Sequence, residues 1–581
     1  MKTSWALAVA TAALSPVAAQ CAAPSDSSSS SSSTSTQSQC HCLPSDSCWP
    51  STETWNSLNS TVGGRLVATV PVGSPCHDPT YDAAACKTLQ DNWHHPQVHL
   101  DSSSSVMQTF FANQSCDPFT AESRSCELGN YVSYAVDVSS SDDVIAAIQF
   151  AQKNNIRFVI RNTGHDYFGR STGAGALSVW MHHLHDVEYQ DWSDSNYEGP
   201  SFKVGAGTMG YQILDAASEK NLVVVTGECP TVGVAGGFIQ GGGHSALSTT
   251  FGLGADQTLE FEVVTADGKL VTANRSQNSD LFWALSGGGA GNYGVVMSVT
   301  VKAHPDVKVA GAGLQFTAAG ISTETFDQAV SKFHSLLPQM IDQGVTVIYQ
   351  MTAVFFAINP VTGYNKTTDE VKSILQPFLN ELSDLGINYK ASWTEYQSYH
   401  DHYNKYMGPL PWGNLEVSTY QYGGRLVPRN ALDSNPSGIG SALRNLTQQG
   451  VIAVGVGLNV SSPGDVSNAV FPEWRRAAVT VQFATSWNET APWSDMIADQ
   501  ERITNEYVPQ LEAVTPGGGT YQNEANFRQP NWQETFFGEN YSPLLQVKQK
   551  YDPDNFFYVL KGVGSEAWTV AENGRMCRSG N

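Results

Sequence analysis

Two segments of the chain carry residues whose types and spacing could hold a phosphorylated or flat ligand. The first, Arg161–Tyr167, follows a strand-like stretch and contains Asn162, Thr163, Gly164, His165 and Asp166. Successive backbone N–H groups in a glycine-containing turn can cradle a diphosphate. The second segment, 227–244, is dense in glycine, which lets a backbone approach a ligand closely. We therefore expect these two segments to form a site for a flat or phosphorylated ligand.

Two other glycine motifs match known patterns in the wrong structural setting. Residues 289–294 read G-x-G-x-x-G, but a dinucleotide-binding turn must follow a strand and open a helix. Here a helical stretch precedes the motif and a strand follows it. Residues 169–173 read G-x-S-x-G, but a nucleophile elbow needs a strand directly before its serine and a helix directly after it. We therefore expect neither a Rossmann site nor a serine hydrolase.

The composition excludes several other functions. The chain of 581 residues has 31 Lys and Arg against 54 Asp and Glu, a formal net charge of −23, which disfavours nucleic acid and anionic membranes as partners. The histidine run at 181–185 has strand spacing, with His183 and His185 on one face. It lacks a suitable carboxylate or cysteine, so no metal site is expected.

The N-terminus and the cysteines predict a secreted protein. Residues 1–19 have the charge, apolar core and small-residue end of a signal peptide, and 20–48 read as a serine-rich linker. No later stretch is apolar enough to span a bilayer. Eight of the ten cysteines fall within 21–126, where Cys76/Cys86 and Cys116/Cys126 are plausible local bridges. Zinc is the alternative for the N-terminal cluster. Eight N-x-S/T sequons predict N-glycans, at Asn59, Asn113, Asn274, Asn365, Asn445, Asn459, Asn488 and Asn540.

The elements that must position these residues change in type along the chain. From 130 to about 305, short buried strands alternate with helices, and a strand-turn-strand hairpin is expected over 259–272. From 306 to about 505, helical runs at 323–337 and 368–385 alternate with strand-like runs at 345–356 and 451–458. This second stretch predicts a separate α+β unit. Residues 515–565 return to glycine, asparagine and aromatic side chains.

Taken together, these motifs resemble the FAD-binding domain of the vanillyl-alcohol oxidase / p-cresol methylhydroxylase (PCMH-type) superfamily. Within it the sequence is most similar to berberine-bridge-enzyme-like secreted fungal oxidases, which include isoamyl alcohol oxidase-like proteins. The match covers about 125–305 and 515–565, where Tyr521-x-Asn523 and Tyr551–Phe557 occur in the right order. The resemblance implies an α+β fold. A two-part FAD-binding domain (49–305 and 506–581) would hold an inserted substrate domain (306–505) that covers the flavin.

The resemblance also implies which residues hold FAD. His165 would bond to the flavin 8α carbon and Cys229 to flavin C6. For Cys229 the alternatives are a free buried thiol or a disulfide to Cys577. The other expected FAD-binding residues are Arg161, Asn162, Thr163, Gly164, Asp166, Gly169, Ser171, Gly227, Thr231, Gly233, Gly236, Gly237, Gly241, Gly242, Gly243, His244, Val295 and Asn523.

The implied reaction is the oxidation of an alcohol, carbohydrate or secondary-metabolite hydroxyl, with O2 reoxidising FAD to give H2O2. Val232 stands at a position that, in relatives, resembles a gate for the access of O2 to the flavin. Glu524 stands where relatives commonly carry a basic tyrosine and could remove the hydroxyl proton, with Tyr521 as second candidate; alternatively, Glu524 only positions Tyr521. Trp412, Tyr420, Tyr422 and Arg425 are the expected substrate residues. The alternatives are a dehydrogenase or oxidative cyclase of secondary metabolism, or a catalytically silent secreted flavoprotein.

Overall fold

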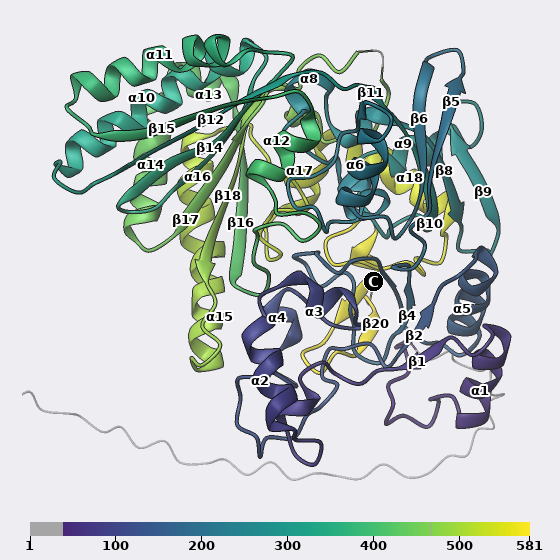
Figure 1. Cartoon of the computed structure of the whole chain (residues 1–581). Helices are drawn as coiled ribbons and strands as arrows, with labels where there is room; N and C mark the ends of the chain where they lie inside the picture. The colour runs from purple at the N-terminus through teal and green to yellow at the C-terminus, as the bar shows by residue number, and fades with distance from the viewer. Residues whose placement is uncertain (1–38, 465, 581) are drawn as a thin grey trace, which may run out of the picture. The chain divides into compact units, whose positions relative to one another are not determined.

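The computed structural model describes residues 39–464 and 466–580 of the chain (Figure 1). The predicted signal peptide and nearly all of the serine-rich tract lie outside these residues. From Cys40 onward the chain forms one compact unit, in which helices and strands are mixed as the predicted α+β class requires. Within the described part, no helix is both long and apolar enough to cross a membrane.

A four-stranded sheet leads directly into the segment that carries His165. Its strand order is β1-β2-β4-β3; β2, β4 and β3 run parallel, and β1 pairs antiparallel with β2. The strands are β1 (Leu66–Ala68), β2 (Tyr134–Asp137), β3 (Phe158–Arg161) and β4 (Leu177–Trp180). Helix α5 (Ser141–Lys153) buries Val144, Ala147, Ile148 and Ala151, a helical spacing that places all four on one face. Because β3 ends at Arg161, the glycine turn begins at the carboxyl end of a parallel strand.

A five-stranded antiparallel sheet lies next along the chain, in the order β5-β6-β10-β8-β9. Its strands are β5 (Val187–Ser193), β6 (Glu198–Gly205), β8 (Thr258–Val264), β9 (Leu270–Asn274) and β10 (Val295–Lys302). The predicted hairpin over 259–272 is confirmed as β8 and β9, which turn at Gly268 with φ +72°. The glycine-rich segment 227–244 runs between β7 (Leu222–Val223) and β8 as loops and short helical turns.

A seven-stranded antiparallel sheet, in the order β15-β12-β14-β13-β17-β18-β16, is built from residues 309–486. Its strands are β12 (Val309–Thr317), β13 (Thr346–Met351), β14 (Phe355–Tyr364), β15 (Tyr389–Tyr396), β16 (Tyr420–Pro428), β17 (Ile452–Gly457) and β18 (Ala477–Ser486). The strand-like run 345–356 is therefore two strands rather than one, because the chain turns back between Met351 and Phe355 within a continuous apolar run.

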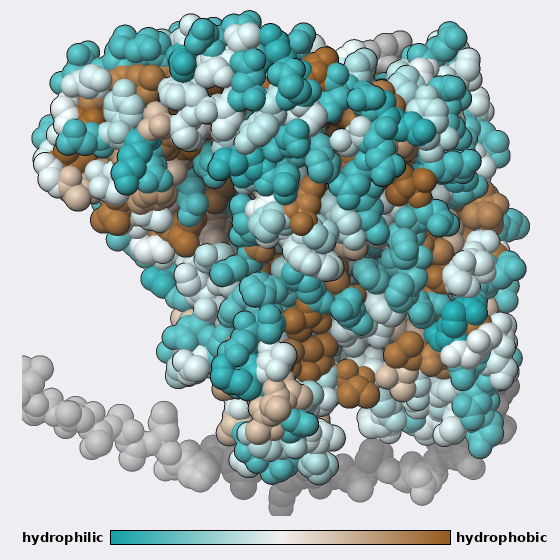
Figure 2. Space-filling view, in the orientation of Figure 1, coloured by the Kyte–Doolittle hydropathy of each residue, from teal (hydrophilic) through white to brown (hydrophobic). Residues whose placement is uncertain are grey.

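Helices cover one face of this seven-stranded sheet, as the ribbons of α10, α11 and α14 in Figure 1 illustrate. Helix α10 (Thr323–Asp342) buries Phe326, Val330, Phe333 and Leu337 at helical spacing, and Ser322 caps its first turn. The helices are α10, α11 (Thr368–Asp384), α14 (Pro436–Gln448) and α16 (Val508–Val514). The molecular surface seen in Figure 2 is mostly hydrophilic, with hydrophobic side chains scattered over it.

The elements not yet given complete the fold. They are α1 (Thr52–Thr61), α2 (Ala83–Asn92), α3 (Pro96–Leu100), α4 (Thr109–Ala112), α6 (Gly210–Ser218), α7 (Ile239–Gly241), α8 (Ser248–Phe251), α9 (Ser279–Leu285), β11 (His304–Pro305), α12 (Tyr399–Tyr406), α13 (Arg429–Ser434), α15 (Trp493–Arg502), α17 (Trp532–Phe537), α18 (Tyr541–Tyr551), β19 (Trp568–Val570) and β20 (Met576–Arg578), with short 3-10 or π turns η1 (Ser74–Cys76), η2 (Val234–Phe238), η3 (Gly254–Gln257), η4 (Pro472–Arg475), η5 (Ile503–Tyr507), η6 (Gly538–Asn540) and η7 (Ser565–Ala567). Among their strands, β11 pairs with β7 and β19 with β20 in two further two-stranded sheets.

Four disulfides join eight of the described cysteines. The bridges Cys76–Cys86 and Cys116–Cys126 are confirmed. Of the other two, Cys40–Cys577 fastens residues 40–48 to the C-terminal segment, and Cys42–Cys48 closes a short loop within them. The linker prediction is therefore wrong for these nine residues, since their three cysteines are disulfide-bonded, and the zinc alternative loses these thiolates.

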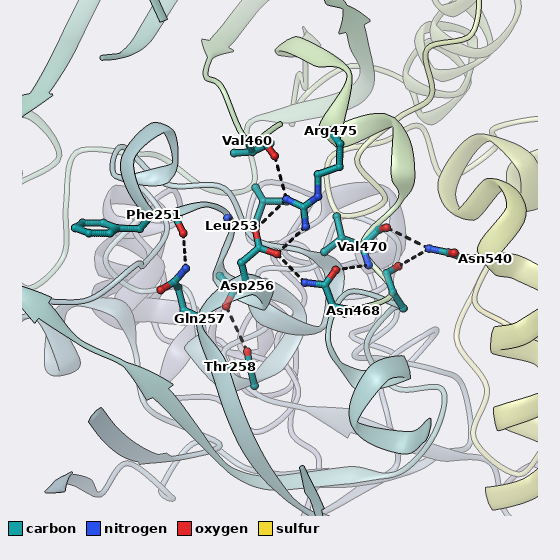
Figure 3. A network of polar contacts seen from close by, with 12 residues as sticks. Phe251, Leu253, Asp256, Gln257, Thr258, Val460, Asn468, Val470, Arg475 and Asn540 are labelled. Atoms are coloured by element: carbon teal, nitrogen blue, oxygen red, sulfur yellow. Dashed lines mark hydrogen bonds and ion pairs between the residues drawn. The ribbon is translucent and has the colours of Figure 1, made fainter. Parts of the chain in front are cut away.

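A buried ion pair ties the glycine-rich region to the seven-stranded sheet (Figure 3). The carboxylate of Asp256, in η3, is fully buried and accepts two hydrogen bonds from Arg475, in η4, at 2.6 and 2.9 Å. It also accepts from the Asn468 amide and from the Leu253 backbone. A buried carboxylate is tolerated when its oxygens are satisfied in this way. This pair therefore connects a segment just after 227–244 to the turn just before β18.

We expect Arg475→Ala to lower the free energy of unfolding by about 3 kcal/mol, because it leaves the Asp256 charge buried without its cation. The neighbouring Arg476 is the matched control: its exposed side chain pairs with Glu473, so Arg476→Ala should cost less than about 1 kcal/mol. Urea unfolding followed by tryptophan fluorescence measures both. Equal losses in the two variants would contradict a structural role for the buried pair.

Candidate active site

One cavity of about 780 Å³ brings together segments that are far apart in the sequence. It lies between the turn after β3, the glycine-rich segment, the seven-stranded sheet and residues 521–524. Of the residues singled out from the sequence, the following line it: Asn162, Thr163, Gly164, His165, Asp166, Ser171, Gly227, Cys229, Val232, Gly233, Gly236, Gly237, His244, Tyr420, Tyr422, Tyr521, Asn523 and Glu524.

His165 and Cys229 meet at a single hydroxyl group. The imidazole Nε2 of His165 lies 2.8 Å from Thr231 Oγ1, and the Cys229 Sγ lies 3.4 Å from the same oxygen. A second contact joins the two segments, since the Gly233 N–H donates to Thr163 Oγ1 at 3.3 Å. The two side chains predicted to reach one ligand therefore lie on the same side of the cavity.

The Arg161 side chain supports the turn that carries His165. The guanidinium is buried and donates to the carbonyls of Ser105 and His99. Gly164 lies directly over it with φ +84°, and a Cβ there would come within 2.4 Å of the guanidinium. Arg161 does not line the cavity, so its predicted contact with the ligand gives way to a role in positioning the turn.

The pKa values of His165 and Cys229 shift in opposite directions from their ordinary values. Burial, helped by the positive charges of His99 and Arg161, lowers the pKa of His165 to about 3. Burial also raises the pKa of the Cys229 thiol, which the Thr231 hydroxyl partly counteracts. His165 is therefore a neutral imidazole over the physiological range, and Cys229 is a protonated thiol.

Cys229 is the only free cysteine among the described residues. The disulfide to Cys577 considered from the sequence is wrong, because Cys577 is bonded to Cys40. The loop that carries Cys229 is fixed by Tyr403, whose hydroxyl lies 2.9 Å from the Gly227 carbonyl and 3.0 Å from the Glu228 carbonyl.

The glycines of the second segment let neighbouring side chains pack tightly against the backbone. A Cβ on Gly233 would lie 2.4 Å from the Asn162 amide nitrogen, and one on Gly241 would lie equally close to the Asn523 amide. Gly241, Gly242 and Gly243 do not line the cavity. Gly241 and Gly243 allow the Asn523 and Phe238 side chains to lie against this backbone.

A cluster of three ionisable side chains occupies the cavity wall. The His244 Nε2 lies 2.7 Å from a Glu524 carboxylate oxygen, and its Nδ1 lies 3.3 Å from Glu228. The His244 side chain is only 8% exposed. Burial acts to lower the pKa of His244, but the carboxylates of Glu524 and Glu228 outweigh it and raise the pKa well above its ordinary value.

Tyr521, the second candidate base, lies beside this cluster with its ring 5.5 Å from the His244 ring. Burial, reinforced by the Glu524 charge, raises its pKa above the usual range. Its hydroxyl accepts a hydrogen bond from the Asn523 amide at 2.7 Å. Tyr521 is therefore a neutral phenol, whereas Glu524 presents a carboxylate.

An aromatic pair lines the cavity beside these polar groups. The rings of Tyr167 and Tyr422 stack with centroids 3.9 Å apart and an interplanar angle of 8°. Burial, together with the Glu524 charge, raises the pKa of Tyr167 to about 12. Tyr420 and Gln482, from β16 and β18, also line the cavity.

Some expected site residues lie elsewhere. Trp412 is 39% exposed and does not line the cavity, and Arg425 turns away from it to bond Thr515 in the loop after α16. Val295 points into the core because side chains alternate along β10, and its neighbours Gly294 and Val296 line the cavity instead. Gly169 packs against the Phe111 ring.

The sequence analysis missed Tyr167, Glu228 and Gln482 as site residues. Tyr167 and Glu228 adjoin motif residues, so their position in the chain was a signal. No local signal marked Gln482, because the face of β18 that meets the cavity is decided by how the strand pairs within the sheet. The histidine run 181–185 is not a strand: it turns at His182 and His183 after β4. Among the described residues, no group of three or more His, Cys, Asp and Glu is arranged to hold a metal ion.

The cavity has the features that a bound FAD requires. Three buried side-chain oxygens on its wall have no hydrogen-bond partner among the described residues: Asn162 Oδ1, Gln240 Oε1 and Gln522 Oε1. Buried polar atoms are normally satisfied, so these point to a polar ligand. The glycine backbone at 233–237 allows the close approach that a flat ring or a diphosphate needs.

The comparisons with known proteins agree with this site. The family described as "FAD binding domain" matches residues 132–274, and the family described as "Berberine and berberine like" matches 520–564. These two matches cover both motif segments and the C-terminal segment that bears Tyr521 and Glu524. Fold and site thus define an FAD-linked oxidoreductase.

Full-length relatives identify the family. The chain is 52% identical to the FAD-linked oxidoreductase ZEB1 of Gibberella zeae over 93% of this chain and 95% of that protein. It also resembles the crystal structure of the VAO-type flavoprotein MtVAO615 from Myceliophthora thermophila C1, with 41% identity, a TM-score of 0.90, and coverage of 93% of this chain and 100% of that one. The protein belongs to the vanillyl-alcohol-oxidase-type, berberine-bridge-like family of FAD-linked oxidoreductases.

A more distant structure shares the fold. The glucooligosaccharide oxidase of Acremonium strictum, described as carrying a 6-S-cysteinyl, 8α-N1-histidyl FAD, is 20% identical with a TM-score of 0.62, over 75% of this chain and 92% of that one.

We expect Tyr403→Phe to destabilise the loop that carries Cys229 by about 1–3 kcal/mol, because two buried carbonyls lose their donor. Tyr399, one turn earlier on α12, is the matched control: it is equally buried, but its hydroxyl has no hydrogen-bond partner among the described residues, so Tyr399→Phe should be nearly neutral. Thermal unfolding measures the difference. A Tyr399→Phe loss as large as that of Tyr403→Phe would contradict the hydrogen-bond argument.

Proposed function

We propose that the protein is a secreted oxidase with bicovalently bound FAD, which oxidises a neutral hydroxyl compound and reduces O2 to H2O2. The observation that carries this proposal is the meeting of His165, Cys229 and the Glu524 carboxylate in one cavity. FAD, when bound, supplies the hydride acceptor and the reaction with O2.

His165 and Cys229 are suited to hold the cofactor covalently. A neutral imidazole has a nitrogen lone pair free to form a bond, and the low pKa of His165 keeps it neutral. The Cys229 thiol forms no disulfide and is therefore free to bond to the cofactor. The cysteinyl and histidyl links of the Acremonium strictum oxidase supply a precedent for such a pair.

Glu524 is proposed as the base that takes the hydroxyl proton. One of its oxygens accepts from His244, while the other takes part in no hydrogen bond among the described residues. The side chain is 23% exposed, so the proton can pass on to water. As the O–H bond breaks, the carbonyl forms while the C–H electron pair leaves as hydride.

The charges on the cavity wall favour a neutral substrate. Four acidic residues line it: Asp166, Glu228, Glu416 and Glu524. The lining contains no lysine, and its one arginine, Arg170, donates to the carbonyls of Leu560 and Lys561. Tyr167, Tyr420 and Tyr422 offer ring faces to an apolar or sugar body. A carboxylate or phosphate on the substrate would meet repulsion there.

Secretion and glycosylation rest on the predicted signal peptide, the four disulfides and the sequons. Four sequon asparagines are exposed, which an attached glycan requires: Asn113, Asn365, Asn445 and Asn488. Val232 lies on the cavity wall and directly follows Thr231 in the chain, a place consistent with its expected influence on O2 access.

For the tethers, acid-precipitated protein should stay yellow, and peptide mass mapping should find flavin on both His165 and Cys229. His165→Ala and Cys229→Ala should each leave one bond and hence one flavin peptide. As a control, Cys42→Ala removes a disulfide cysteine and should leave both flavin peptides in whatever protein folds. Flavin that washes out of the wild type would refute both links.

For the reaction, neutral alcohols and lactols should release H2O2 in air, and their carboxylate counterparts should not. With any active substrate, Glu524→Gln should slow anaerobic flavin reduction by about 10²–10³-fold while changing substrate affinity less than about threefold. Glu534→Gln, an exposed carboxylate in the same C-terminal segment, is the control and should reduce at the wild-type rate. No peroxide over a broad panel would favour a silent flavoprotein, and an unchanged rate in Glu524→Gln would remove its role as base.

A further inference from the structure

The proposed function assigns a role to Glu524 but none to His244 and Glu228, the two side chains that form a hydrogen-bonded cluster with it. His244 lies between Glu524 and Glu228, with Nε2 2.7 Å from one carboxylate and Nδ1 3.3 Å from the other. A neutral imidazole has one N–H and one lone pair, so one of these contacts would set a lone pair against a carboxylate. Both contacts are favourable only when both ring nitrogens are protonated. The arrangement itself therefore favours an imidazolium cation.

The groups packed around this cluster add no further charge at neutral pH. Tyr521, Tyr167 and Cys229 face it, and burial raises the pKa of each. Tyr399 and Tyr403, from α12, lie near Glu228, and burial raises their pKa as well. The Trp474 ring, 6.2 Å from the His244 ring, is uncharged. The charges of the cluster are therefore two carboxylates and one imidazolium.

We propose that His244 is a fixed imidazolium clamp, anchored by Glu228, that keeps Glu524 ionised and turned toward the substrate and takes no proton during the reaction. The proposal rests on the role of Glu524 as base. Because both His244 nitrogens already carry protons, a proton taken by Glu524 stays on that carboxyl until water removes it. The clamp therefore differs from a relay, in which the histidine would itself accept the proton.

The clamp places Glu524 in a defined geometry. Oε1 is occupied by the His244 N–H, which leaves Oε2 as the oxygen that can accept the substrate proton. The nearby cation also stabilises the charged carboxylate in a site where burial would otherwise favour its neutral form. Glu228 acts in two ways: it holds the imidazolium through Nδ1, and its own negative charge disfavours a second negative charge on Glu524.

These two effects predict pH shifts of opposite sign. The variant His244→Gln keeps an N–H donor at this position but removes the positive charge that favours the ionised carboxylate of Glu524. The acid limb of anaerobic flavin reduction should then move up by about one pH unit or more, with rates about tenfold lower on the acid side and convergence at alkaline pH. Glu228→Gln removes a like charge, so its acid limb should move down or stay in place.

The matched control is His400, whose Nε2 lies 2.7 Å from Asp215, the same distance as in the His244–Glu524 pair, but outside the cavity lining. His400→Gln should reproduce the wild-type pH profile. An acid limb unchanged in His244→Gln would overturn the clamp and leave a structural hydrogen bond. A uniform loss at every pH in Glu228→Gln would favour a relay and would likewise overturn it.

A second measurement reads the charge without turnover. In the 15N spectrum of histidine-labelled protein, the signal absent from His244→Gln should show both ring nitrogens protonated between about pH 5 and 9. If that variant does not fold, Glu228→Gln, which keeps the imidazole, identifies the signal by its shift. A neutral tautomer, combined with slow reduction in Glu524→Gln, overturns the clamp alone. A full reduction rate in Glu524→Gln overturns the proposed base, and the clamp's function with it.

Discussion

The site depends on one hydroxyl group, that of Thr231, which lies within hydrogen-bond distance of both His165 and Cys229. Those two side chains come from segments 64 positions apart, each of which is a loop rather than a helix or strand. A loop keeps a geometry only when its backbone polar groups are satisfied. The buried guanidinium of Arg161 holds one loop and the Tyr403 hydroxyl holds the other. The convergence is thus enforced from behind, by residues that never face the cavity.

The same division between supporting and facing residues explains the charge distribution. Three arginines lie close to the site in the fold, but each already donates hydrogen bonds to a carbonyl, hydroxyl or carboxylate group. They are Arg161, Arg425 and Arg475. The cavity wall is left with acids, aromatic rings, the imidazoles of His165 and His244, and one arginine, Arg170, that donates to backbone carbonyls. In such a buried setting each unpaired charge would be costly, and pairing His244 with two carboxylates lowers that cost. The acidic wall is therefore a consequence of where the cations are used.

Sequence patterns predicted the elements with strong local signals. Helix α11 and strand β17 follow their expected bounds, 368–385 and 451–458, closely, because buried positions recur at the helical or alternating period. The motif residues His165 and Cys229 also meet in space as their order suggested. The reverse turn between β13 and β14 was missed, since an apolar run does not show where it folds back. The Cys40–Cys577 bridge, across 537 positions, could not be read from spacing at all.

Errors at the site share one cause, which is that a residue type does not reveal its facing direction. Val295 and Val296 are chemically alike, and only the pleat of β10 decides which one meets the cavity. Arg425 and Tyr422 lie three positions apart on β16, so they point to opposite faces, and only the tyrosine lines the cavity. Glu228 shows the reverse case. Its neighbour Cys229 drew attention as the chemical group, yet the backbone turn that presents the thiol also directs the Glu228 carboxylate at His244. One loop therefore supplies both the proposed covalent anchor and the charge proposed to set the state of the base, so a change in its conformation would alter cofactor attachment and proton transfer together.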